Sequence, residues 1–389
     1  MPVDEPSLTR RHLLAAAGAA PLVLAASRTF AQTAAGQPMH GEAAPQPVVP
    51  GEQMRWAIVG LGSFGINQVI PGFADARQSR MSAFVSGNAA KARDLGARHA
   101  VSRFYDYANY DTMKNDAEID CVYIVLPVGL HAEYTVRALE AGKHVLCEKP
   151  MASTSAECER MIAAARANNR QLGVAYRVHF EPTNREALRR IKAGEIGAMR
   201  HIQCDHGFSA SLDFPPHKWR LTKELGGGGS LWDVGIYGVN TSLMMLDEEP
   251  VELTASYAYP KDDPRFVEVE GGIDWRMKMA SGINIQGSSS YCYSPYASRQ
   301  RYFGSEASFI MDPATTYYDN NLVKEGGGPR HEIGAGNSRN QFAAQVDGFS
   351  QAARDNKPHL TPGEMGLRDL RLMEAMYRSA DNGGAAVKL

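Results

Sequence analysis

The stretch Arg55-Trp56-Ala57-Ile58-Val59-Gly60-Leu61-Gly62-Ser63-Phe64-Gly65 decides the fold. Its first five residues predict a buried strand, and its three glycines have the spacing Gly-x-Gly-x-x-Gly ahead of a predicted helix. Gly60 permits the tight turn, Gly62 lets the backbone approach a pyrophosphate, and Gly65 lets helix and strand pack closely. Free N–H groups at the start of the helix favour the negative charge of such a group. The stretch therefore predicts a dinucleotide-binding turn.

Strands and helices alternate after this turn. We expect strands at residues 81–85, 121–126, 144–147 and 172–175, with helices at 89–99, 131–141 and 155–168. Such alternation predicts a parallel sheet with right-handed crossovers, which is a Rossmann domain over residues 55–177.

The pattern changes in residues 178–389. After a predicted helix at 184–193, strand-like stretches joined by turns predominate, at 199–204, 251–257, 267–279, 283–291, 301–303 and 308–311. Turns in place of crossover helices predict a mostly antiparallel sheet. We expect a C-terminal α+β domain built on a large open sheet, with a last helix at 364–382 packed against it, so the fold class is α/β overall.

The N-terminus has the features of an export signal. Thr9-Arg10-Arg11-His12-Leu13-Leu14 opens an alanine-rich apolar run that ends near Ala31, which predicts a twin-arginine signal peptide over residues 1–31. The run is too short and too rich in Ala and Gly for a membrane anchor, so we expect a periplasmic protein with no membrane association after cleavage. Residues 32–54, rich in Pro, Gly, Ala and Gln, predict an arm or a disordered linker.

Composition excludes several classes of partner. A length of 389 residues with 44% apolar composition suffices for two cores. The net charge of −2 leaves no broad basic field, so nucleic acid is not expected as a partner. The five cysteines are an odd number without a C-x-x-C pair, so neither a metal site nor a required disulfide framework is predicted.

The end of the second strand indicates which dinucleotide is bound. NAD enzymes usually place an acid there, whereas this chain has Ser86-Gly87-Asn88, with Lys91 one turn later. A hydroxyl and a cation suit a 2′-phosphate, which a carboxylate would repel. NADP is therefore predicted, although Lys91 is also compatible with an ordinary solvated helix lysine.

Two motifs supply residues for hydride transfer from a sugar hydroxyl, which needs a base and a cation. Glu148-Lys149-Pro150 follows a Rossmann strand at the edge where ligands bind, which makes Lys149 a candidate. After the glycine run 226–229, Asp233 and Tyr237 are four residues apart at a helix start and share one face. An acid and a phenol facing Lys149 predict a proton relay. The alternative is a helix-capping run with a half-buried tyrosine.

Two further pairs lie where the chain passes between domains. Tyr176 is a second phenol able to exchange a proton, and Arg177 beside it is expected to contact cofactor or sugar. Trp219-Arg220 is expected to pack on the nicotinamide or on a sugar face.

Together these residues resemble the Gfo/Idh/MocA family, and more closely its glucose-fructose oxidoreductase branch. The resemblance covers nearly the whole chain, at residues 60–62, 85–88, 130–133, 147–151, 176–177, 219–221, 227–238 and 311–315. Most of the wider family has His where this chain has Tyr237, and the tyrosine is typical of the branch.

The resemblance implies a periplasmic enzyme with tightly bound NADP. One aldose is oxidised at C1 to an aldonolactone, and a second sugar is reduced to an alditol by the same cofactor, in a ping-pong cycle. It implies a catalytic group of Lys149, Asp233 and Tyr237, with Tyr176 as a further acid/base, and the same four residues with Tyr296 as sugar-binding. The cofactor-binding residues it implies are Gly60, Gly62, Ser63, Phe64, Gly65, Ser86, Gly87, Lys91, Tyr105, Leu126, Pro127, His131, Glu148, Lys149, Arg177, Trp219 and Arg220.

The resemblance also implies a homodimer or homotetramer formed through the open C-terminal sheet, with the arm around the adenine or a neighbouring subunit. The loop 209–217 departs from the glucose-fructose enzyme, which leaves aldose and ketose both open as acceptor. Two alternatives remain: an NADP-dependent sugar or inositol dehydrogenase with exchangeable cofactor, and a non-catalytic sugar-binding protein.

Overall fold

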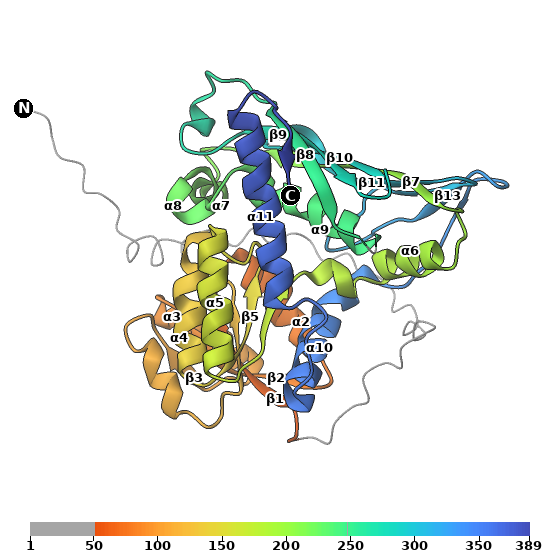
Figure 1. Ribbon diagram of the computed structural model, residues 1–389. Helices are drawn as coiled ribbons and strands as arrows, with labels where there is room; N and C mark the ends of the chain where they lie inside the picture. The colour runs from red at the N-terminus through yellow and green to blue at the C-terminus, as the bar shows by residue number, and fades with distance from the viewer. Residues whose placement is uncertain (1–50, 247) are drawn as a thin grey trace, which may run out of the picture.

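The computed structural model describes residues 51–246 and 248–389. The predicted signal peptide and most of the predicted arm lie outside these residues. Figure 1 shows two sheets, one above the other, with a long helix, α11 (Gly363–Asp381), running alongside both.

The first sheet has six parallel strands in the order β3-β2-β1-β4-β5-β6. The strands are β1 (Met54–Val59), β2 (Ser79–Val85), β3 (Arg103–Tyr105), β4 (Cys121–Ile124), β5 (His144–Glu148) and β6 (Leu172–Ala175). The order reverses between β1 and β4, which is where open parallel sheets bind ligands. The predicted Rossmann fold is confirmed.

Helices cover both faces of this sheet because successive side chains of a strand point to opposite faces. Trp56 and Ile58 of β1 pack on one side, and Ala57 and Val59 on the other. The first side is covered by η1 (Gly65–Val69), α2 (Ile70–Ala74), α3 (Ala89–His99) and α10 (Gln341–Asp355). The second side is covered by α4 (His131–Glu140) and α5 (Ser155–Ala167).

Helix α10 was not among the helices expected from the sequence, although it completes the core of the first domain. Its Val346 and Phe349 are buried against Trp56, whose Nε1 donates to Ser350 Oγ at 3.0 Å. Residues late in the chain thus return to the Rossmann sheet.

The second sheet has nine strands in the order β14-β13-β12-β11-β7-β10-β9-β8-β15. The β7 and β10 strands pair in parallel and the other neighbours pair antiparallel, so the mostly antiparallel sheet is confirmed. The strands are β7 (Met199–Ser209), β8 (Pro250–Tyr257), β9 (Gly272–Met279), β10 (Asn284–Ser290), β11 (Cys292–Gly304), β12 (Ser308–Met311), β13 (Val323–Glu325), β14 (His331–Glu332) and β15 (Val387–Lys388).

One face of the second sheet is covered and the other is open. Burial alternates along β9: Ile273, Trp275 and Met277 are buried, whereas the residues between them are exposed. The covered face packs against η6 (Leu231–Gly235), α9 (Ile236–Met244) and α11. The remaining helical segments are η2 (Tyr110–Asn115), η3 (Val128–Leu130), η4 (Arg177–Phe180), α6 (Pro182–Lys192), α7 (Pro215–Lys218), η5 (Trp219–Leu221), α8 (Lys223–Gly226), η7 (Pro264–Phe266) and η8 (Ser338–Asn340).

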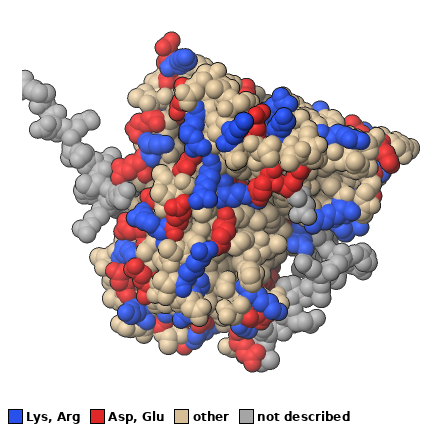
Figure 2. All heavy atoms as spheres, viewed as in Figure 1, with Lys and Arg blue, Asp and Glu red and all other residues tan. Residues whose placement is uncertain are grey.

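Basic and acidic side chains are interspersed on the face formed by α5 and α11 (Figure 2). Ion pairs such as Arg166 with Glu364 and Arg371 with Glu159 join the two helices. Within residues 51–246 and 248–389, no helix is both long enough and apolar enough to cross a bilayer. In the same ranges, no three His, Cys, Asp or Glu side chains meet where they would hold a metal ion.

Candidate active site

The glycine-rich turn after β1 has room for a ligand at one of its three glycines. Gly60 has φ +100°, and a Cβ there would lie 2.3 Å from the carbonyl oxygen of Val125. A Cβ on Gly65 would lie 2.8 Å from the carbonyl oxygen of Gly60. A Cβ on Gly62 would meet no atom within 4 Å, so that residue faces open space. Packing explains Gly60 and Gly65, whereas Gly62 fits the approach of a pyrophosphate.

The residues predicted to bind the adenosine end lie together at the ends of β2 and β3. Ser86 Oγ accepts from the Asn88 N–H at 3.1 Å, and the Asn88 side chain caps α3. Lys91 Nζ donates to the carbonyl of Leu61, in the glycine turn, at 3.1 Å, and partial burial lowers the pKa of Lys91. Tyr105 donates to Asp116 at 2.7 Å, while its carbonyl accepts from the Ser86 N–H.

His131, which was predicted to bind the cofactor, joins the ends of β4 and β5. Its Nδ1 is 2.8 Å from the carbonyl oxygen of Pro150, and its Nε2 is 2.8 Å from that of Leu126. Glu148 accepts from Tyr123 at 2.6 Å, and burial raises the pKa of Glu148. The predicted cofactor residues at this edge are therefore held in fixed positions at the carboxyl ends of two neighbouring strands, β4 and β5.

Lys149, Asp233 and Tyr237 come together from the two domains. Lys149 Nζ donates to the main-chain oxygen of Asp233 at 2.5 Å and lies 3.6 Å from Asp233 Oδ1. The same nitrogen lies 4.6 Å from the centre of the Tyr237 ring. The expected shared face of Asp233 and Tyr237 is present, formed by the π-helical turn η6 and the start of α9. The structure thus brings together the three residues predicted from separate motifs.

Asp233 is held by three partners. Its Oδ2 accepts from Arg220 Nε at 2.9 Å and from the Tyr291 hydroxyl at 3.2 Å, in addition to the Lys149 contact. Burial by itself would raise the pKa of Asp233, but the charges of Arg220 and Lys149 outweigh burial and lower it. An ionised carboxylate therefore orients the ammonium of Lys149.

Tyr237 lies between a guanidinium and an imidazole. Its hydroxyl oxygen is 2.9 Å from Arg177 Nη2, which donates to it, and its ring stacks on that of His206 at 6.1 Å between centres. Burial raises the pKa of Tyr237, and the charge of Arg177 opposes that shift.

Tyr176 does not join this cluster. Only 2% of its surface is exposed, its hydroxyl has no hydrogen-bond partner among the described residues, and the carboxylate of Asp369 on α11 is the nearby acid that acts on it. The pKa of Tyr176 is raised well above its usual value, mainly by burial and secondly by the negative charge of Asp369. The reason is local: Tyr176 directly follows β6, where α11 packs against the sheet. The predicted acid/base role of Tyr176 is therefore not supported by its position.

Other predicted site residues surround the cluster at different depths. Arg220 stacks on Trp219, with its guanidinium carbon 4.3 Å from the ring centre, so the pair is engaged with Asp233 and with itself. Tyr296 is 50% exposed, and burial and the nearby Tyr237 raise the pKa of Tyr296. Phe64 packs on Tyr317 across the domain boundary.

Sequence reasoning missed three aromatic residues of the site. Tyr291 contacts Asp233, Tyr317 lies 4.6 Å below the Arg177 guanidinium carbon, and His206 stacks on Tyr237. Tyr291 ends a predicted strand, and Tyr317 follows the matched stretch 311–315, but neither stands in a motif of its own.

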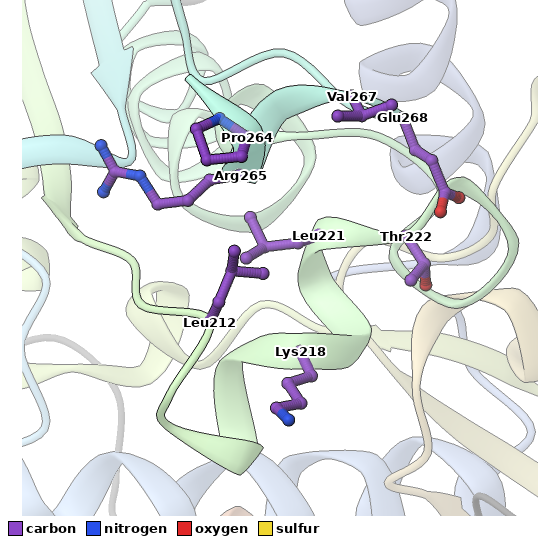
Figure 3. Close-up of a pocket in the computed structure, with 8 residues that line it drawn as sticks. All are labelled: Leu212, Lys218, Leu221, Thr222, Pro264, Arg265, Val267 and Glu268. Atoms are coloured by element: carbon purple, nitrogen blue, oxygen red, sulfur yellow. The ribbon is translucent and has the colours of Figure 1, made fainter. Parts of the chain in front are cut away.

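A cavity of about 310 Å³ lies beside the loop at residues 209–217 (Figure 3). Figure 3 shows Leu212 and Leu221 side by side below Pro264. Leu221 directly follows Arg220, so one short helical segment, η5, contributes to this cavity and to the charged cluster. The full lining is Leu212, Lys218, Leu221, Thr222, Pro264, Arg265, Val267 and Glu268.

A glycine turn at the reversal point of a parallel sheet, next to a lysine, a carboxylate and a phenol, defines an oxidoreductase that uses a dinucleotide. Residues 54–176 match the oxidoreductase family with an NAD-binding Rossmann fold, and residues 184–310 match the GFO/IDH/MocA C-terminal domain. The chain belongs to the Gfo/Idh/MocA family.

Similar proteins are enzymes of sugars and polyols. The crystal structure of aldose-aldose oxidoreductase from Caulobacter crescentus, complexed with glycerol, is 38% identical, with a TM-score of 0.83, over 87% of this chain and 100% of that chain. The D-xylose 1-dehydrogenase [NADP(+)] of Haloarcula marismortui is 28% identical over 84% of this chain and 91% of its own length. An inositol dehydrogenase homolog from Azotobacter vinelandii, complexed with NAD+, is 25% identical, with a TM-score of 0.77, over 87% of this chain and 98% of that chain. The chain is thus a sugar oxidoreductase with an NAD(P)-binding Rossmann domain.

Proposed function

We propose that this protein oxidises an aldose at C1 to an aldonolactone and reduces a second sugar to an alditol, with one tightly bound NADP serving both half-reactions. The observation that carries the proposal is the contact of Lys149 with both Asp233 and Tyr237 at the end of β5. The likeness to an aldose-aldose oxidoreductase supports the pairing of two sugars.

When bound, the nicotinamide supplies an acceptor and a donor for hydride. The turn at Gly60 and Gly62 would hold the pyrophosphate, and Leu126, Pro127 and His131 would border the nicotinamide. Lys149, oriented by Asp233, donates a hydrogen bond to the reacting sugar oxygen and stabilises negative charge that develops on it. Tyr237 exchanges the hydroxyl proton.

NADP is proposed over NAD because the end of β2 offers Ser86 and Lys91 and no carboxylate in the ribose-binding position. Lys91 is anchored on the glycine turn, beside the place where a 2′-phosphate is expected. Measuring the affinity for both nucleotides tests this choice. Lys91→Ala is expected to weaken NADP binding by about tenfold, the loss of one charge-assisted hydrogen bond, and to leave NAD binding unchanged.

The acceptor sugar is proposed to be an aldose. The support is the similarity to the Caulobacter protein together with the loop at residues 209–217, which departs from the glucose-fructose enzyme. Product analysis with glucose as donor, and with candidate aldoses and fructose as acceptors, distinguishes the two. A preference for fructose would contradict the aldose proposal.

The closed cycle is tested by purifying the protein without added nucleotide. We expect NADP to be released on denaturation, and the purified protein to convert glucose and an acceptor without any supplement. Protein that arrives empty, or turns over only with added NADP, would support the second candidate. That candidate is a dehydrogenase with exchangeable cofactor, like the Haloarcula D-xylose enzyme. Unchanged turnover after Lys149→Ala would instead support a non-catalytic sugar-binding protein.

Export and assembly belong to the same proposal. An exported enzyme meets little free NADP in the periplasm, so it has to carry and recycle its own. Replacing Arg10 and Arg11 by Lys is expected to retain the protein in the cytoplasm, as fractionation would show. The open face of the second sheet, with Asp274, Arg276 and Lys278 exposed on β9, is proposed as the surface of a homodimer or homotetramer. Light scattering measures the molar mass in solution and therefore the number of subunits.

A further inference from the structure

Two buried phenols, Tyr176 and Tyr237, have opposite electrostatic surroundings. The carboxylate of Asp369 is the nearby acid that acts on the Tyr176 hydroxyl. The Tyr237 hydroxyl accepts from Arg177 Nη2 at 2.9 Å, and Lys149 Nζ lies 4.6 Å from its ring centre. A nearby carboxylate disfavours a phenolate and nearby cations favour one. Burial raises the pKa of both phenols, and each also has a charge of the other sign nearby, Arg368 at Tyr176 and the carboxylates of Glu148 and Asp233 at Tyr237. Loss of a proton is therefore opposed less at Tyr237, which Arg177 contacts, than at Tyr176.

Arg177 is buried among neutral acceptors. Only 4% of its surface is exposed. In the described part of the chain, its terminal nitrogens donate to Tyr237 and to Gln341 Oε1 at 2.6 Å, the Thr315 carbonyl at 2.6 Å and the Thr316 carbonyl at 3.2 Å. Of these acceptors, only the phenol can become an anion. Because a buried charge is costly without a partner, ionisation of Tyr237 supplies a counter-charge.

We propose that Arg177 is a positioning residue that makes Tyr237, and not Tyr176, the group that exchanges a proton with the sugar hydroxyl. This inference rests on the proposed function, because it assigns the proton of that reaction to one of two candidate phenols.

The proton and the electrons balance over one cycle. In the oxidation half, the O–H bond of the C1 hydroxyl breaks and its proton goes to the phenolate oxygen of Tyr237. The C1–H bond breaks, and its hydrogen would leave with the electron pair as hydride, for which a bound oxidised nicotinamide would be the acceptor. In the reduction half, the hydride returns to the carbonyl carbon of the acceptor, and Tyr237 gives its proton to the carbonyl oxygen. Tyr237 ends as it began, without an external oxidant.

The charge balance at Tyr237 depends on Arg177. The titratable or charged groups that face it are Arg177, Lys149, Glu148, Asp233, His206, Tyr296 and Tyr317. Burial is the main cause that raises the pKa of Tyr237. The charge of Arg177 lowers this pKa, and the charges of Glu148 and Asp233 raise it further. Burial, with the charges of Lys149 and Arg177, lowers the pKa of His206 to about 3, so its ring is neutral near pH 7. Removing Arg177 therefore leaves the acids dominant, with Lys149 over the ring as the remaining cation.

Ionisation of Tyr237 can be measured without turnover. The near-ultraviolet absorption of tyrosinate is titrated in the mature protein as purified, and the curve of Tyr237→Phe is subtracted to isolate Tyr237. Arg177→Gln is expected to raise the midpoint by about 1 to 3 pH units, the usual effect of one close opposite charge. Arg177→Lys keeps a cation, and its shift should be smaller. Equal midpoints in wild type and Arg177→Gln would overturn the inference.

The pH dependence of the oxidation half-reaction, measured in a single turnover with bound or added NADP, should move by the same amount. Gln341→Leu is the matched control: it removes a partner of Arg177 but keeps the charge, so it should lower Tm and leave the midpoint unchanged. If Arg177 only stabilises residues 315–317, both variants lower Tm and neither moves the midpoint of the Tyr237 titration.

If Arg177→Gln does not fold, the titration of the wild-type protein tests the inference instead. A Tyr237 that ionises no earlier than Tyr176, isolated by subtracting Tyr176→Phe, overturns the inference. Because the absorbance titration needs no sugar, failure of the two-sugar cycle stays distinguishable.

Discussion

Two glycine-rich turns, at residues 60–65 and 226–229, begin in the same way and serve different ends. Each leads into a π-helical turn, η1 or η6, and then into an α-helix. In the first turn, a Cβ on Gly62 would meet no atom within 4 Å. In the second, a Cβ on Gly229 would lie 1.9 Å from the carbonyl oxygen of Glu270. Glycine is used in one place to leave space for a ligand, and in the other to pack a helix that carries Asp233.

Gly229→Ala should give the largest effect. The added Cβ collides with backbone, so the turn must shift and displace Asp233 from Lys149. We expect a loss of about 3 kcal/mol or more in the free energy of unfolding, measured by denaturant titration. Gly334→Ala is the control, because a Cβ there meets no atom within 4 Å. A stable Gly229→Ala protein with normal activity would show that the second turn is not limited by packing.

Lys149→Met tests whether Asp233 and Tyr237, which follow the second turn, take part in catalysis or whether that turn only caps a helix. It keeps the length of the side chain and removes the charge that contacts Asp233 and Tyr237. Because positioning and oxyanion stabilisation are both lost, kcat should fall by about 10²-fold or more. Lys192→Met, on α6, is the control for a general effect of charge. Unchanged kcat would favour the capping interpretation.

Gly62→Ala separates ligand space from packing in the first turn. Because its Cβ meets open space, the free energy of unfolding should change by less than about 1 kcal/mol. The same methyl would obstruct the pyrophosphate, so we expect a dinucleotide affinity about tenfold weaker or more. Calorimetric titration of nucleotide-free protein with NADP measures it, with Gly334→Ala as reference. Equal affinity in the two variants would remove the argument for a phosphate at Gly62.

Tyr291→Phe should have the smallest effect. It removes one hydrogen bond to Asp233, at 3.2 Å, while Arg220 and Lys149 remain in place. A loss of about 1 kcal/mol corresponds to a roughly fivefold lower kcat. Tyr257→Phe, which removes a similar hydrogen bond to Asp381 far along α11, should leave kcat unchanged. A larger loss than that of Lys149→Met would move Tyr291 to the centre of the mechanism.

The first turn was predictable from sequence because its rule is local. Gly60, Gly62 and Gly65 follow a strand within a few residues, and the fold then places Lys149 at the same edge. The pairing of Asp233 with Tyr237 was also predictable, since one helical face carries both. Their meeting with Lys149 depends on how the two domains pack, and it was expected from the resemblance to the family. The contact of Tyr291 with Asp233 was not predictable, because it joins the end of a strand to a helical turn 58 residues away, and no spacing rule links the two.

Arg177 and helix α10 show two limits of prediction from sequence. Arg177 was expected at the cofactor or the sugar, but its hydrogen bond to Tyr237 depends on how two domains pack, which no local pattern encodes. Helix α10 did have a signal: Phe342, Val346, Phe349 and Ala353 recur at helical spacing. Gly348 in its middle and its few large apolar residues made the pattern weak.

Because α10 supplies Val346 and Phe349 to the core around Trp56, we expect that the Rossmann sheet does not fold without the end of the chain. A fragment that ends at residue 180 would expose that core and leave the Nε1 donor of Trp56 without Ser350. We therefore expect both sheets to melt in a single cooperative transition.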